Sequence, residues 1–80
     1  MRIYKDEIRL TEVICNCCGR GLKVEDGMLK EGCFHVDHVF DYFSKRDGER
    51  DIFDLCEDCY EKMTGDFKFP VTSTEVTEYL

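Results

Sequence analysis

Cys15-Asn16-Cys17-Cys18-Gly19 and Cys56-Glu57-Asp58-Cys59 give this chain of 80 residues two C-x-x-C pairs, with 37 residues between them. Each pair can direct two thiolates toward one metal ion, and four thiolates complete a tetrahedral site. Because such a site closes a long loop, metal binding and folding become one event. The spacing therefore predicts a structural metal site with the ligands Cys15, Cys18, Cys56 and Cys59.

The six cysteines of the chain also allow two other interpretations. Three disulfides would suit a small secreted scaffold, but the charged segment 1–7 does not have the apolar stretch of a secretory signal. A redox-active C-x-x-C would need a thioredoxin-like βαβ pattern, which neither pair has. We therefore favour the metal site and expect a cytoplasmic protein. No segment reaches the ~20 apolar residues that cross a membrane, so we expect no membrane partner.

The first pair contains a third cysteine, Cys17, and the sequence suggests which two of the three bind metal. Gly19 follows Cys18 directly. A C-x-x-C-G turn needs a residue that can adopt positive φ while backbone N–H groups point at the sulfurs. This favours Cys15 and Cys18 as ligands. Cys17 is then a bystander, although it could compete for the metal or be an oxidisable thiol.

Cys33, His35 and His38 form a separate C-x-H-x-x-H pattern. It could be a second metal site, but three ligands within six residues usually need a fourth from elsewhere in the chain. The alternative is that Cys33 packs in the core, as small cysteines often do, and that the histidines lie on a strand.

Four thiolates restrict the metal to zinc or iron. Iron would indicate a rubredoxin-like electron carrier with two glycine-terminated turns. Here the second pair is followed by Tyr60-Glu61-Lys62-Met63, which predicts a helix instead. We therefore expect one Zn²⁺ per chain. A zinc ion with four protein ligands has no open position for substrate, and no other catalytic set is evident, so we do not expect an enzyme.

The rest of the chain predicts short strands, hairpins and one helix. We expect a strand over 8–14, a hairpin at Asp26-Gly27, a strand over 34–43 and a second Asp-Gly turn at 47–48. Leu55, Cys59 and Met63 recur at intervals of four, so a helix of two to three turns should carry Cys59 and stop near Gly65. The proline-containing segment 67–80 should be extended and could add an edge strand. We also assign five aromatic residues to the core of a small sheet: Phe34, Phe40, Tyr42, Phe43 and Phe53.

Between residues 13 and 65, this order of motifs resembles a treble-clef zinc finger. The matching segments are Ile14-Cys15-Asn16-Cys17-Cys18-Gly19 and Phe53-Asp54-Leu55-Cys56-Glu57-Asp58-Cys59-Tyr60. The chain is also similar to short zinc-finger proteins of bacteria and their phages with paired C-x-x-C motifs. The resemblance implies a single small α+β zinc-binding domain over 1–80, with extra flanking strands, in an intracellular protein. Treble clefs serve nucleic-acid binders and protein-interaction modules alike, so the fold does not select a function.

Charge is the strongest indication of the partner. The chain has 18 acidic and 11 basic residues, a net charge of −7, and a tetrathiolate zinc site would add about −2. Phosphate backbones would be repelled. We therefore expect a small module that binds another protein, with a nucleic-acid-associated transcriptional regulator as the alternative. A thiol redox sensor using Cys17 is a further possibility, and an exposed strand edge could support a homodimer.

Overall fold

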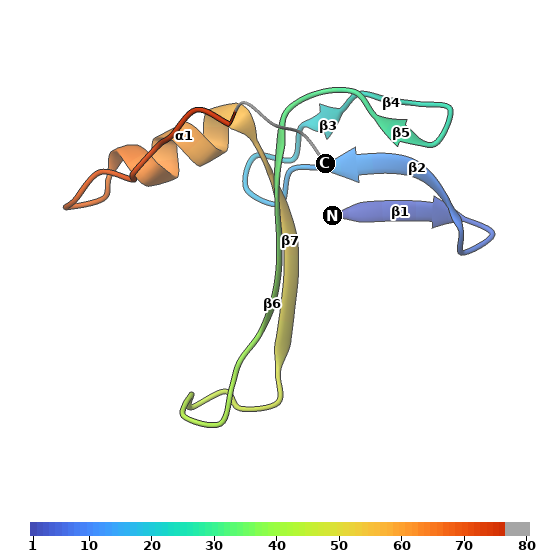
Figure 1. The fold of residues 1–80 in the computed structure, drawn as a ribbon. Helices are drawn as coiled ribbons and strands as arrows, with labels where there is room; N and C mark the ends of the chain where they lie inside the picture. The colour runs from blue at the N-terminus through green and yellow to red at the C-terminus, as the bar shows by residue number, and fades with distance from the viewer. Residues whose placement is uncertain (77–80) are drawn as a thin grey trace.

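The computed structural model describes residues 1–76, which form seven strands and one helix. In chain order these are β1 (Arg2–Lys5), β2 (Arg9–Ile14), β3 (Gly21–Leu22), β4 (Val24–Glu25), β5 (Met28–Leu29), β6 (Cys33–Val39), β7 (Arg50–Cys56) and α1 (Glu57–Gly65). β1, β2 and β3 form an antiparallel three-stranded sheet, whereas β4–β5 and β6–β7 are two-stranded hairpins (Figure 1). The small α+β fold that the sequence predicts is confirmed.

β1 is an element that the sequence analysis did not predict, because its segment is charged rather than alternating. It pairs with β2 through a turn in which Asp6 and Glu7 both have positive φ, 53° and 65°. That backbone shape matches the twist of a tight hairpin even without glycine. The register shifts after Ile3, where the Thr11 hydroxyl donates to the Ile3 carbonyl over 3.0 Å. β1 brings the start of the chain against β7.

The Asp-Gly hairpin expected in the middle of the chain is confirmed as β4–β5. Its turn residues Asp26 and Gly27 have φ of 51° and 77°, the combination that favours Asp-Gly in two-residue turns.

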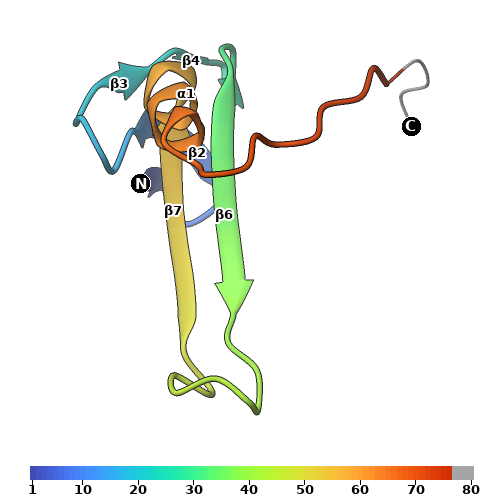
Figure 2. The same ribbon diagram turned by 90° about the vertical axis from the view of Figure 1, so that its left-hand side faces the viewer.

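The β6–β7 hairpin forms an arm that projects from the rest of the molecule (Figures 1 and 2). Seven residue pairs join the strands, from Cys33 opposite Cys56 to Val39 opposite Arg50. β6 ends at Val39, four residues before the predicted end, because residues 40–49 form the folded tip of the arm. There Arg46 lies 4.5 Å from the centre of the Phe40 ring.

The assignment of the five aromatic residues to a sheet core is wrong for Phe34, Tyr42 and Phe43, whereas Phe53 packs against the buried core residues. Tyr42 is 80% exposed, Phe43 is 92% exposed and Phe34 is 38% exposed, while Phe40 and Phe53 are half-buried. A two-stranded ribbon needs a second layer to cover a face. The distal part of the arm has no such layer among residues 1–76, so its apolar side chains face solvent.

α1 begins directly after Cys56 and ends at Gly65, as the sequence predicts. Glu57 and Asp58 lie in its first turn and Lys62 in its last, an order that the helix dipole favours. Over residues 67–76 there is no strand, so the possible edge strand is not found there. Residues 77–80, the remainder of that prediction, lie outside the described residues.

Buried apolar residues are few. Among the described residues the core cluster consists of three aliphatic residues and three cysteines: Val13, Leu22, Leu55, Cys15, Cys56 and Cys59. Three aliphatic side chains are too few to stabilise a fold of this length, and small domains usually need a metal or disulfides in addition. Half of this core is the cysteine cluster itself.

Candidate metal centre

Three separate elements place the four predicted ligands around one point. Cys15 and Cys18 lie in the connection between β2 and β3, Cys56 is the last residue of β7, and Cys59 lies in the first turn of α1. Their sulfur atoms all lie within 4.8 Å of one another, and those of Cys18 and Cys56 are 3.8 Å apart. A tetrahedron with metal–sulfur bonds of about 2.3 Å has edges of about 3.8 Å. The donor set and its spacing therefore fit one metal ion.

The first cysteine pair has the local geometry that its sequence indicates. Gly19 has φ of 80°, the positive value expected for the residue after the pair. The Cys18 N–H lies 3.5 Å from Cys15 Sγ, and the Gly19 N–H donates to the Cys15 carbonyl over 2.9 Å. The turn thus directs a backbone donor at a sulfur atom, which stabilises a thiolate.

The thiols of the cluster influence one another's ionisation. Burial opposes ionisation of Cys15, but backbone groups of Cys18 and Cys56 lower the pKa of Cys15 to about 6. The backbone N–H of Cys59, at the start of α1, lowers the pKa of Cys56. The pKa of Cys59 is raised, mainly by its hydrogen bond with Cys56. Close thiols cannot all ionise without a compensating cation, so this donor set suits a dication that binds four thiolates.

The remaining candidate ligands lie outside this cluster. Cys17 is exposed, and within the described part of the chain the only metal-compatible group is the one formed by the four predicted cysteines. His35 and His38 are on β6, as the strand alternative expects. The His38 ring packs edge-on against Phe40, with ring centres 4.8 Å apart. Cys33 and His35 both contact Asp54 instead.

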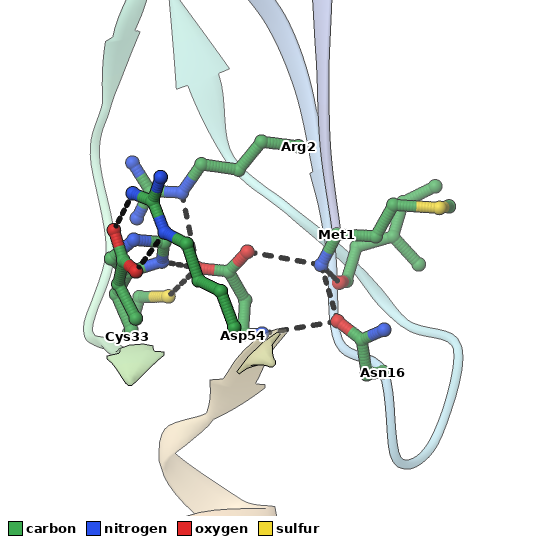
Figure 3. A network of polar contacts seen from close by, with 9 residues as sticks. Met1, Arg2, Asn16, Cys33 and Asp54 are labelled. Atoms are coloured by element: carbon green, nitrogen blue, oxygen red, sulfur yellow. Dashed lines mark hydrogen bonds and ion pairs between the residues drawn. The ribbon is translucent and has the colours of Figure 1, made fainter. Parts of the chain in front are cut away.

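Asp54 is a buried charged residue beside the cysteine cluster, and the sequence did not predict its role. It lies on β7 beside the second cysteine pair, and its side chain is fully buried. Oδ2 accepts from the Met1 ammonium group over 3.0 Å, and Oδ1 accepts from Arg2 Nε over 3.0 Å (Figure 3). His35 Nδ1 is 2.8 Å from Oδ1. The only sequence signal was an acidic residue between Phe53 and Leu55 in an otherwise apolar strand end.

These contacts keep the carboxylate charged. Burial alone would raise the pKa of Asp54, but the Met1 ammonium, His35 and Arg2 together hold it well below its ordinary value. A buried carboxylate without such partners would be strongly destabilising. The network therefore attaches β1 to the base of the arm.

Cys33, His35 and Asp54 do not form a nucleophilic triad. Cys33 Sγ lies 3.5 Å from Asp54 Oδ1, the atom that also contacts the imidazole. Burial and Asp54 raise the pKa of Cys33. A catalytic thiol needs a base that receives its proton and a lowered pKa. The arrangement is that of a structural network around one buried carboxylate.

Comparisons with known protein families, with curated proteins and with solved structures find no match to this chain. Its class therefore follows from its own geometry: a small α+β chain with a cluster of four cysteines that could bind zinc or iron. None of the described helices is both long and apolar enough to cross a membrane.

Proposed function

We propose that the chain is a non-catalytic module, stabilised by one Zn²⁺, that presents the β6–β7 arm to a protein partner in the cytoplasm. The observation that carries the proposal is the position of the cysteine cluster. It joins the N-terminal sheet, the base of the arm and α1, and it supplies half of the buried core. A metal in this position would hold the elements together.

The second cysteine pair favours zinc over iron. Cys56 and Cys59 span the junction of β7 and α1, whereas a rubredoxin-type site would use a second glycine-terminated turn. A cysteine turn, a hairpin and a cysteine pair that opens a helix follow one another in the order of a treble clef. We therefore propose a treble-clef-type zinc site with all four positions taken by protein, which leaves none for substrate.

The exposed apolar side chains of the arm favour a protein as the partner. The distal half of the arm exposes four large apolar side chains: Val39, Tyr42, Phe43 and Ile52. The tip that carries Tyr42 and Phe43 is held in shape by Arg46, which pairs with Glu49 and Asp51 and covers Phe40. Exposed aromatic residues on a preorganised loop are typical of protein interfaces.

Nucleic acid has less support as the partner. Of the four basic residues near the start of the chain, Arg2 pairs with Asp54 and Arg20 pairs with Glu31. Of these four, Lys5 and Arg9 are the two without an ion pair to another described residue, and the net charge of the chain is −7. Two lysine or arginine side chains do not make the basic patch that binds a phosphate backbone.

Site-specific photo-cross-linking in the native host tests the proposal. A benzophenone amino acid replaces Tyr42 at the tip of the arm, and a control chain carries it at exposed Glu12 on β2. We expect one defined, nuclease-resistant protein adduct from position 42 alone. Adducts to nucleic acid, or the same set of adducts from both positions, would contradict the proposal.

A further inference from the structure

A groove lies between the start of β6 and the first two turns of α1, and we call it the helix groove. Its volume is about 450 Å³, and it is lined by six residues: Gly32, Cys33, Phe34, Glu57, Tyr60 and Glu61. Resting on the proposed function, we propose that the helix groove takes an arginine side chain of the protein partner.

Charge in the helix groove favours a cation. Glu57 and Glu61 are four residues apart and therefore lie on one side of α1, where like charges destabilise a helix. Other acidic residues, such as Glu31 and Asp37, pair with an arginine. Neither glutamate of the helix groove pairs with a basic residue within the described part of the chain. A bound cation would compensate both carboxylates.

The walls of the helix groove favour a planar cation. The rings of Phe34 and Tyr60 lie 4.7 Å apart, inclined at 44°, beside the two carboxylates. Guanidinium groups stack on aromatic faces and also form paired hydrogen bonds to carboxylates, whereas the compact ammonium group of lysine cannot do both as well. Arginine is therefore the side chain that can contact both the aromatic rings and the carboxylates of the helix groove.

An arginine that contacts an aromatic ring and two carboxylates is already present within the protein, at the tip of the arm. Arg46 lies 4.5 Å from the centre of the Phe40 ring and donates to Glu49 over 2.5 Å and to Asp51 over 2.8 Å. The helix groove presents the same components, an aromatic surface and two carboxylates, with the arginine left to the partner.

Gly32 determines where the Glu57 carboxylate lies. A Cβ atom at position 32 would lie 1.7 Å from Glu57 Oε1, and φ at this position is not in the left-handed region. Alanine is therefore compatible with the backbone, but it displaces the flexible Glu57 side chain. Gly32→Ala changes the helix groove without changing the net charge.

The test is an NMR titration of the zinc-loaded, ¹⁵N-labelled full chain with N-acetyl-Gly-Arg-Gly-amide, and with the same peptide carrying neutral citrulline. We expect the arginine peptide to shift the amide signals of Gly32, Phe34 and Tyr60, and the citrulline peptide to leave them in place. Glu57→Gln with Glu61→Gln should weaken binding about tenfold. Gly32→Ala should weaken it severalfold. Asp41→Asn with Asp47→Asn removes the same charge at the distant tip and should change the affinity less than twofold.

Shifts spread over the whole acidic surface, equal shifts by the citrulline peptide, or equal losses in the two double variants would overturn the inference. If the glutamate double variant loses the dispersed NMR spectrum of a folded protein, the affinity of Gly32→Ala for the arginine peptide tests the inference instead. This variant keeps every charge of the chain. Metal content and the cross-linking experiment test the proposed function separately. A folded zinc protein that cross-links from position 42 but ignores the arginine peptide would overturn this inference only.

Discussion

Asn16 and Asp54 bind each other through reciprocal hydrogen bonds, although 38 positions separate them. The Asn16 N–H donates to the Asp54 carbonyl over 2.8 Å, and the Asp54 N–H donates to Asn16 Oδ1 over 3.0 Å. Asn16 lies inside the first cysteine pair, and Asp54 lies two residues before the second. The two halves of the metal centre are therefore aligned by direct bonds as well as by any metal they share.

Removing the charge of Asp54 should destabilise the fold. Asp54→Asn keeps the shape of the side chain but leaves the Met1 ammonium and Arg2 without their buried anion. Because both partners are partly exposed, we expect a loss of about 2–3 kcal/mol in the free energy of unfolding. Chemical denaturation of the zinc-loaded proteins measures it. Asp37→Asn is the control, since its pair with Arg50 lies at the surface and should matter far less. Equal losses in the two variants would refute the role given to the network.

The advantage of wild type over Asp54→Asn should not change between about pH 4.5 and pH 5.5. This range lies below the one in which amino groups and imidazoles usually titrate, which matters because Asp54 contacts the Met1 ammonium and His35. The pKa of Asp54 is lower in the folded chain than its ordinary value of 3.8. Its stabilising contribution is therefore complete above that value and is lost only as pH falls below it. Urea unfolding of both proteins across this range, with zinc in excess, measures the difference. A difference that varies with pH in this window would mean that the carboxyl group titrates there and that its pKa is raised.

Gly19→Ala should cost about 1–2 kcal/mol, because a residue with a Cβ must then hold φ of 80°. No atom lies within 4 Å of the added Cβ, so the cost comes from the backbone alone. Gly21→Ala is a matched control, with equally open space and no positive φ. Thermal unfolding should show a clear decrease in Tm for the first variant and little or none for the second. The same Tm for both would show that the turn does not require glycine.

The cysteine cluster and the turns could be predicted from the sequence because their signals are local. Cysteine spacing, Gly19 after Cys18 and the Asp26-Gly27 turn each encode a short-range geometry. Asp54 could not be assigned a partner, since its cations come from the other end of the chain. The prediction was wrong for Phe34, Tyr42 and Phe43, because alternation predicts a strand but does not show whether another layer covers its face.

Substitutions at the tip and at the base of the arm test directly which of its side chains are buried. Phe43→Ala should change the free energy of unfolding by less than about 0.5 kcal/mol, because its side chain is 92% exposed. Leu55→Ala, at the buried base of the same hairpin, should cost about 2–4 kcal/mol. Denaturant titration of both zinc-loaded variants provides the comparison. A large loss at Phe43 would mean that the tip is covered and that the arm does not project into solvent.

The metal content of the natively purified protein tests the proposed zinc site directly, measured by elemental analysis together with a visible absorption spectrum. We predict one colourless zinc per chain in wild type and in Cys17→Ser, whose thiol lies outside the cluster. In Cys56→Ser we predict loss of both the metal and the folded state. Iron with a strong visible band would contradict the zinc assignment. A folded Cys56→Ser protein, or a wild type that folds without metal, would contradict the structural role of the four cysteines.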